Sequence, residues 1–275
     1  MRILVISTCN PCDLYIIREV AARFPVCGIL RPVPAPARGL NWKNFLKRPL
    51  KLLAGTINQR FMAYRAHTAD AWTSRALFGE TAPEIPEDVF DIPGTEINLP
   101  ATVEKIAAVA PDVILVCGAP VLAPEVFNIA RLASINIHYG IAPDYRGEHT
   151  LFWPLRAGDY QHLGITIHLI DNGIDTGRPL VRGFPPLDAF DTEKSITLKC
   201  ARMTPSILIP LLQSMADTGA APSLKPSEKA RRGVFIRYQD RKLRHDFAYE
   251  IRRHLGRASP PVQPERIEKL YIEDS

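Results

Sequence analysis

Cysteine is scarce in this sequence, with five residues in a chain of 275. An odd and sparse set of thiols argues against a disulfide framework and for a reducing compartment, so we expect a cytoplasmic protein. Cys9 and Cys12 form one C-x-x-C pair. Without a second pair or a nearby histidine this spacing is a weak metal signal, and we interpret both thiols as part of the loop and helix start after the first strand.

Long hydrophobic runs are also missing. No apolar stretch reaches the roughly 18 residues that a membrane-spanning helix needs. The N-terminal MRILVISTCN has an apolar run that ends at Ser7, shorter than the core of a secretory signal, and we interpret it as a first strand. The composition, 46% hydrophobic and 23% charged, excludes disordered, collagenous and coiled-coil chains.

Three common functional motifs are absent. The first strand is followed by STCNPCD, without the G-x-G-x-x-G of a dinucleotide-binding loop. The sequence has no G-x-x-x-x-G-K-[ST] phosphate-binding loop and no G-x-S-x-G around a nucleophilic serine. These absences argue against nicotinamide-dependent enzymes, P-loop nucleotide hydrolases and serine hydrolases of that type.

The net charge of +5 is unevenly distributed. Residues 31–65 contain eight Arg or Lys and no acidic residue, whereas residues 70–104 contain eight acidic residues and one arginine. Residues 225–257 contain eleven basic and four acidic residues. The two basic blocks could bind a phosphorylated substrate, a nucleic acid or an anionic membrane, or they could be solvated helical faces.

Short apolar runs alternate with helical patterns along much of the chain. Residues 2–7 and 26–31 flank a helical stripe over 12–24, which predicts a strand–helix–strand unit with parallel strands. Further strands are expected at 112–117, 134–138, 163–170 and 179–183, and further helices at 99–110, 123–131, 149–158 and 191–217. We therefore predict an α/β fold with a Rossmann-like, mostly parallel sheet and helices on both faces.

Residues 32–85 interrupt this alternation. They begin with the proline-rich RPVPAPARG, continue with a basic amphipathic stretch over 42–53 and end in a predicted helix near 57–78. We interpret them as a helical insertion in a catalytic domain of residues 1–217. Residues 218–275 are basic and contain proline, and we expect them to form a small C-terminal appendage.

The most informative stretch covers residues 134–177. In SINIH, alternation directs Ile135 and Ile137 into the core and places Asn136 and His138 together on the other face, at the C-terminal end of a strand. Sites in open α/β sheets gather outside such ends. An amide can stabilise charge that develops on a carbonyl oxygen and an imidazole can move protons, so this pair suits carbonyl chemistry.

A tight loop follows the next predicted strand. Its sequence, DNGIDTG at 171–177, has two glycines and two aspartates and can direct a carboxylate toward the end of the sheet. A carboxylate beside Asn136 and His138 would orient the imidazole and keep it basic. We expect Asp175 to take this role and Asp171 to cap a turn.

This segment resembles the active-site region of the folate-dependent formyltransferases. Their pattern is Asn-x-His, a Pro-x-x-Arg-Gly loop, a strand and Asp-x-Gly-x-Asp-Thr-Gly, and the three motifs occur here in order at 136–138, 143–147 and 171–177. A weaker match covers roughly residues 1–31 and 95–215. The family includes glycinamide ribonucleotide, methionyl-tRNA and sugar N-formyltransferases.

The resemblance implies formyl transfer from 10-formyltetrahydrofolate to an amine, with Asn136, His138 and Asp175 as a catalytic triad. It also implies that the pterin of the folate lies along the strand end at 115–120 and the loop at 169–175. The cofactor-binding residues that follow are Val116, Gly118, Ile170, Asp171 and Gly173. The expected substrate-binding residues, on the loop that borders the acceptor, are Tyr139, Tyr145 and Arg146.

The sequence does not identify the formyl acceptor. We favour a small amine, such as an amino sugar on a nucleotide, whose phosphates the basic blocks could meet. Methionyl-tRNA formylation and hydrolysis of the donor are alternatives in the same site, although the C-terminal region lacks the barrel-like strand series that would bind tRNA. No feature indicates DNA. A non-catalytic protein that lies on a membrane through residues 42–53 is an alternative of another class. The oligomeric state is not indicated.

The remaining histidines give little indication of a functional site. His149 could join His138 and Asp175 in a metal site, but no cysteine or second histidine stands at ligand spacing, so we expect no metal. For His168, as for the other four, the sequence suggests no partner.

Overall fold

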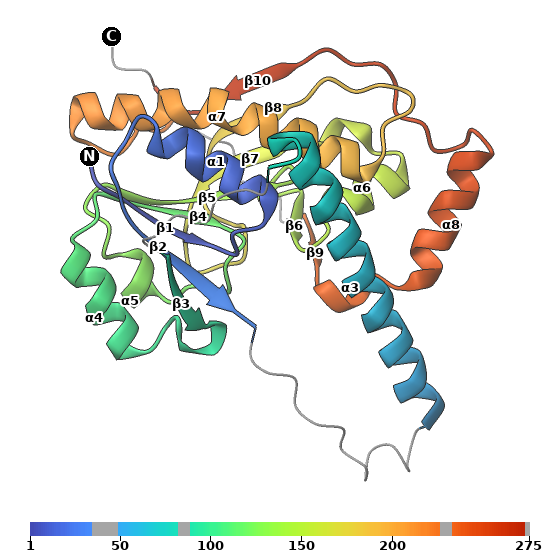
Figure 1. Cartoon of the computed structure of the whole chain (residues 1–275). Coiled ribbons are helices and arrows are strands. Elements are labelled where there is room, and N and C mark those ends of the chain that lie inside the picture. The colour runs from blue at the N-terminus through green and yellow to red at the C-terminus, as the bar shows by residue number, and fades with distance from the viewer. Residues whose placement is uncertain (35–48, 82–88, 226–232, 273–275) are drawn as a thin grey trace.

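The computed structural model describes residues 1–34, 49–81, 89–225 and 233–272 (Figure 1). Its centre is an eight-stranded sheet. In spatial order the strands are β10 (Arg266–Lys269), β8 (Pro179–Phe184), β7 (Ile165–Leu169), β5 (Ala133–Tyr139), β4 (Val113–Cys117), β1 (Ile3–Ser7), β2 (Val26–Val33) and β3 (Val89–Pro93). A second, two-stranded sheet pairs β6 (Tyr145–Gly147) with β9 (Val234–Ile236).

The main sheet is mostly parallel. The pairs β2–β3, β1–β2, β1–β4 and β4–β5 are parallel, and β5–β7, β7–β8 and β8–β10 are antiparallel. The predicted α/β sheet is therefore confirmed. The strand direction reverses between β5 and β7, which are the two strands that carry the predicted site.

Helices cover both faces of this sheet. The longer helices are α1 (Pro11–Ala21), α3 (Pro49–Phe78), α4 (Pro100–Val109), α7 (Glu193–Thr218) and α8 (Leu243–His254), and the short ones are α5 (Pro124–Phe127), α6 (Phe152–Ala157) and the 3-10 turns η1 (Gly94–Glu96), η2 (Tyr160–His162) and η3 (Tyr238–Asp240). Side chains of β1 alternate between two cores: Ile3 and Val5 pack with α1 and α7, whereas Leu4 and Ile6 pack with α4 and α5.

The predicted insertion contains one long helix. α3 begins at Pro49, eight residues before the expected start, and contacts α1, α7 and α8. Of the basic amphipathic stretch at 42–53, residues 42–48 lie outside the described residues. Among the helices that the structure describes, none is long and apolar enough to cross a membrane.

The segment after residue 218 contributes to both sheets. β10 forms an edge of the main sheet beside β8, and β9 pairs with β6 next to the predicted site. α8 begins where Leu243 donates its backbone N–H to the side chain of Asn58 on α3, at 2.8 Å. The division into a catalytic domain 1–217 and an appendage 218–275 stays a prediction.

A buried ion cluster joins three helices. Arg241, which is 1% exposed, donates to both carboxylate oxygens of Glu193 at 2.7 and 2.8 Å and to Asp246 at 2.6 Å. Arg65 donates to Glu193 at 2.8 Å and lies 3.0 Å from Asp246. We call these four residues the Arg241 cluster; they tie α3, α7 and α8 together.

Candidate active site

The strand pair β5–β7 brings the polar residues of the site together. The antiparallel register places Asn136 opposite His168 and His138 opposite Thr166. Ile135 and Ile137 are buried in the core, as the alternation predicts. Because residues opposite each other across a ladder point to the same face, Asn136 and His168 are neighbours.

The loop after β7 has a conformation that depends on its glycines. Asp171 accepts hydrogen bonds from the backbone N–H of Gly173 at 2.9 Å and from the Thr176 hydroxyl at 2.6 Å, which is the turn-capping role expected of it. A Cβ at Gly177 would lie 1.6 Å from the carbonyl oxygen of Leu169. The loop therefore folds tightly against the end of β7 and returns Asp175 to the sheet.

Asp175 is the centre of the site. Its Oδ1 accepts from the Asn136 amide nitrogen at 3.3 Å and lies 3.5 Å from His168 Nε2. Its Oδ2 accepts from the backbone N–H of Gly147 at 2.8 Å and lies 3.5 Å from His138 Nδ1. We call Asn136, His138, His168 and Asp175 the Asp175 cluster.

The carboxylate of Asp175 is held in its ionised form. Burial by itself raises the pKa of a carboxyl group, but His168 at 3.5 Å, His138 and the Gly147 N–H outweigh it and lower the pKa of Asp175 to about 2. Burial in turn lowers the pKa of His138, against the opposing effect of Asp175. At neutral pH the pair is therefore a carboxylate beside a neutral imidazole.

The tautomer of His138 follows from its second contact. Its Nε2 lies 3.0 Å from the carbonyl oxygen of Tyr145, which can only accept a hydrogen bond. In the neutral ring the proton is therefore on Nε2, and the lone pair of Nδ1 faces Asp175. This arrangement can take up a proton at Nδ1 and stabilise it with the carboxylate.

His168 is the residue of the site that the sequence analysis missed. Its Nε2 lies 3.0 Å from the Asn136 amide nitrogen, and its Nδ1 lies 2.8 Å from the carbonyl oxygen of Leu169. His168 thereby fixes the amide of Asn136. The signal that could have found it is the strand pairing, because an antiparallel register between the two predicted strands places residue 168 beside residue 136.

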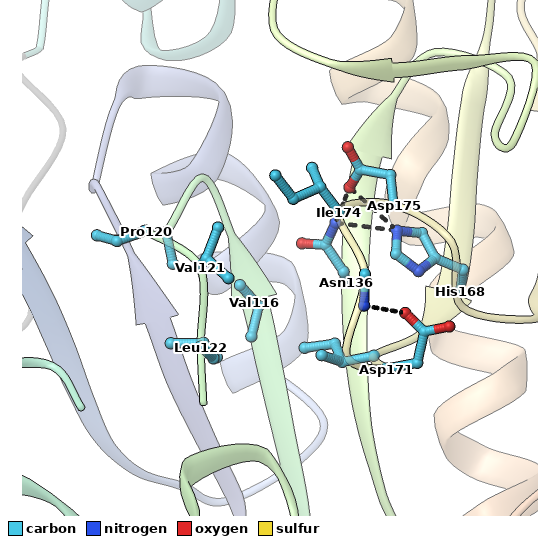
Figure 2. A pocket seen from close by; sticks show the side chains of 12 residues that line it. Val116, Pro120, Val121, Leu122, Asn136, His168, Asp171, Ile174 and Asp175 are labelled. Atoms are coloured by element: carbon cyan, nitrogen blue, oxygen red, sulfur yellow. Dashed lines mark hydrogen bonds and ion pairs between the residues drawn. The ribbon is translucent and has the colours of Figure 1, made fainter. Parts of the chain in front are cut away.

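A pocket of about 100 Å³ opens beside this cluster (Figure 2). Asn136, His168 and Asp175 point toward one another on one side of it, and apolar residues lie across from them. His138 does not line the pocket. Its Nδ1 lies near Oδ2 of Asp175, whereas His168 lies near Oδ1. The apolar residues opposite are Val116, Pro120, Val121 and Leu122.

A family model described as Formyl transferase matches residues 72–212, just over half of the chain. The chain belongs to this family. The resemblance seen in the sequence motifs is thereby confirmed.

Relatives of the chain include a methionyl-tRNA formyltransferase of Legionella pneumophila (strain Corby). It is 30% identical over 173 residues, which are 62% of this chain and 55% of the relative. The chain thus spans about half the length of the curated relatives it matches.

Solved structures show the same fold at low identity. A sugar N-formyltransferase from Shewanella sp FDAARGOS_354 has a TM-score of 0.55 and 16% identity, over 87% of this chain and 78% of that one. The sugar 3N-formyl transferase WlaRD, solved in the presence of dTDP and 5-N-formyl-THF, has a TM-score of 0.52 and 15% identity, over 88% and 72%.

Most of the residues that the family resemblance implied for folate binding line the pocket. They are Val116, Ile170, Asp171 and Gly173. Gly118 does not line it: its φ of +66° turns the chain after β4, and a Cβ there would lie 3.3 Å from the Thr8 hydroxyl. Folate binding by these residues stays a prediction.

The residues expected on the acceptor side lie around the cluster and not in the pocket lining. Tyr139 continues the core-facing alternation of β5, and its hydroxyl is buried. The Tyr145 hydroxyl donates to Asp159 at 2.9 Å. Arg146 donates to the carbonyl oxygens of Ile174 at 3.3 Å and Gly233 at 3.5 Å, so it braces the loop of Asp175. Their role in substrate binding stays a prediction.

His149 does not reach the Asp175 cluster. Its Nδ1 lies 3.5 Å from Arg241, and its ring lies 5.1 Å from the ring of Tyr238. Burial, together with the Arg241 charge, lowers the pKa of His149 to about 4. Within the ranges that the structure describes, no group of three or more His, Cys, Asp or Glu residues is placed to hold a metal ion.

Proposed function

We propose that this protein transfers a formyl group from 10-formyltetrahydrofolate to an amine of a small acceptor, such as an amino sugar linked to a nucleotide. The observation that carries the proposal is Asp175, one ionised carboxylate that contacts Asn136, His138 and His168 at the wall of a pocket. Amide, imidazole and carboxylate together supply the donors and the proton acceptor that acyl transfer to an amine needs.

The pocket has the character that a folate donor requires. Val116 and Leu122 offer apolar contacts to the faces of a flat ring system, and the loop with Asp171 and Gly173 offers polar groups to its edges. When bound, the donor supplies the formyl carbon. The residues that would hold its ring system are those of the predicted set that line the pocket: Val116, Ile170, Asp171 and Gly173.

The chain's own residues divide the chemistry among them. One N–H of the Asn136 amide stays on His168, and the other, which donates to Asp175 at 3.3 Å in the free protein, would turn to the oxygen on which negative charge develops. The proton that the attacking amine loses would be taken up at Nδ1 of His138 and returned to the folate nitrogen that leaves the formyl carbon, with Asp175, 3.5 Å from Nδ1, stabilising the imidazolium in between. Asp175 stays ionised because its pKa is about 2.

The relatives support a formyl acceptor of one of two kinds. WlaRD is named a sugar 3N-formyl transferase, whereas the Legionella relative is named a methionyl-tRNA formyltransferase. We favour the small acceptor because β9 and β10, the strands described after residue 218, pair with β6 and β8 of the catalytic region. The described part of the chain shows no separate strand-built module there for tRNA.

The test is an assay of donor consumption with the purified protein and excess chelator. 10-Formyltetrahydrofolate is supplied alone, with dTDP- or UDP-linked amino sugars, or with methionyl-tRNA. Release of tetrahydrofolate and the mass of the acceptor are followed. We expect release that depends on an amino sugar and adds a formyl group to it.

Each other outcome excludes the proposal in a different way. Release without any amine would identify a hydrolase of the donor. Release with methionyl-tRNA alone would identify the tRNA activity. Absence of both release and folate binding would show that the fold is kept without turnover.

A further inference from the structure

The outward face of α8 carries apolar side chains where a surface helix usually carries polar ones. Leu243, Phe247, Ile251 and Leu255 follow one another at intervals of four residues, from the first residue of the helix to the residue after its end, so they lie along one side. All four are exposed, with Phe247 at 67% and Leu255 at 61%. We call them the α8 stripe.

The inward face of the same helix combines an ion pair with one aromatic ring, because Tyr249 packs against Phe152 in the core. Asp246 and Tyr249 are its buried residues, and Asp246 is bound by Arg241 at 2.6 Å and lies 3.0 Å from Arg65. Most apolar side chains of α8 thus face solvent, unlike those of a helix that packs an apolar side against a core. Turning α8 to bury the stripe would break the Arg241 cluster, so the ion pairs hold the apolar side toward solvent.

Basic side chains surround the stripe at both ends. The exposed ones are Lys242, Arg244, Arg252 and Arg257, and Arg253 is half-buried. The exposed acidic residue of the helix, Glu250, is engaged by Arg253 at 2.9 Å. The surface of α8 is therefore apolar along its centre and cationic around it, the pattern of a helix that lies in the interface of a membrane.

We propose that α8 docks this protein on an anionic membrane surface, with the α8 stripe entering the boundary between headgroups and acyl chains. α8 lies at the outer edge of the molecule, where a flat surface can reach it (Figure 1). Anionic lipid complements the surrounding arginines, and their long side chains can extend to the headgroups while the stripe is buried.

The charge around the α8 stripe also argues against two other binding partners, a second copy of this chain and a nucleic acid. In a symmetric, antiparallel pairing of two copies, Arg244 of one copy would lie near Arg252 and Arg253 of the other, and the like charges would repel. A nucleic acid would match the positive charge. It would gain little from Leu243, Ile251 and Leu255, since bases stack on aromatic side chains and not on aliphatic ones.

The proposal is tested by flotation of the full chain with vesicles. One set contains phosphatidylcholine and phosphatidylglycerol, and the other contains phosphatidylcholine alone. The wild type should bind the anionic vesicles, and binding should weaken at high salt. Phe247→Ser with Ile251→Ser should weaken binding about tenfold or more, because two apolar side chains lose their burial.

Three further double variants test the apolar and the charged contributions separately. Phe90→Ser with Leu99→Ser is the matched control: Phe90 is 62% exposed, and both residues lie far from α8, on β3 and just before α4 (Figure 1). It should bind as the wild type does. Arg244→Gln with Arg257→Gln should weaken binding about fivefold per charge, whereas Arg23→Gln with Lys105→Gln, on other exposed surfaces, should not.

Several results would overturn the proposal. One is a wild type that leaves anionic vesicles unbound at low salt. Another is equal vesicle binding by the double serine variant of α8, which would assign the binding to another surface. A third is a dimer, seen by sedimentation, that the same variant abolishes. Circular dichroism checks that the variants fold, and formyl transfer in solution should not change, so this proposal and the proposed function fail independently.

Discussion

The molecule holds two buried groups of charges that are balanced by different partners. In the Arg241 cluster, Glu193 and Asp246 face the guanidinium groups of Arg241 and Arg65. In the Asp175 cluster, one carboxylate faces two imidazoles and an amide. A guanidinium keeps its charge at any pH that a protein survives, whereas an imidazole changes its charge near neutrality.

The pKa values of the carboxylates do not distinguish the two clusters. In both clusters burial raises the pKa and the partners more than compensate, so that Asp175 and Glu193 each have a pKa of about 2. What separates them is the chemistry of the partner. The Arg241 cluster can only hold elements together, and the Asp175 cluster can in addition move a proton. Four substitutions test whether the partners of these carboxylates set their roles.

The largest effect is expected from Asp175→Asn. The change removes the charge that faces both imidazoles and would stabilise the imidazolium of His138, so turnover should fall at least about a hundredfold while circular dichroism stays that of a folded protein. Asp188→Asn is the control, because Asp188 is an exposed carboxylate that pairs with Lys199 at 2.8 Å and does not line the pocket. A variant at Asp175 that keeps more than about a tenth of the wild-type turnover would contradict the assigned role.

The next effect is on stability. Arg241→Met leaves Glu193 and Asp246 buried with Arg65 as their remaining partner, and should lower the free energy of unfolding by about 3–5 kcal/mol in urea titrations. Arg253→Met removes an exposed pair with Glu250 and should cost about 0–1 kcal/mol. Turnover per folded molecule should be kept in both variants; a catalytic loss that exceeds the folding loss would place the Arg241 cluster in the chemistry.

A smaller effect is expected from His168→Gln. His168 holds the amide of Asn136 at 3.0 Å, so its loss should lower kcat about tenfold by releasing that amide. His162→Gln is the control, since His162 contacts Asp159 at 2.8 Å and does not line the pocket. The proposed positioning role is wrong if kcat is unchanged and only the KM for the donor rises, because His168 would then act through binding alone.

The smallest effect concerns the pH dependence of stability. His149 has a pKa of about 4 in the folded chain, below its ordinary value of 6.5. Between these values the unfolded chain binds the additional proton, so stability falls as the pH drops from about 6.5 toward 4. His149→Asn should flatten this part of the curve, measured by urea unfolding at several pH values. An unchanged slope would show that other groups, such as His138, account for it.

Below that range the carboxylates of the two clusters act in the same direction. The pKa of Glu193 falls from 4.5 to about 2 on folding, and that of Asp175 from 3.8 to about 2. Their stabilising contribution is present above the unfolded values and is lost as the pH drops through the folded values. Acid should therefore loosen both clusters together below pH 4.5.

The sequence predicted the parts of the site that depend on local geometry. Strand alternation placed Asn136 and His138 on one face, and the glycines of 171–177 indicated the turn that returns Asp175. It did not predict His168, because that residue enters the site through the pairing of β5 with β7. Nor did it predict that Tyr139, expected on the acceptor side, turns its hydroxyl into the core.

Local sequence was enough to predict the alternation of strands and helices and the placement of Asn136, His138 and Asp175, because periodicity and tight turns are set by neighbouring residues. The family motifs added the catalytic role that we propose for these three residues. Tertiary structure alone decided that β10 joins the main sheet, that His168 fixes Asn136 and that Arg241 holds α8 with its apolar side outward. These features depend on contacts between residues far apart in the chain. Neither periodicity nor motif spacing records which distant segments will meet.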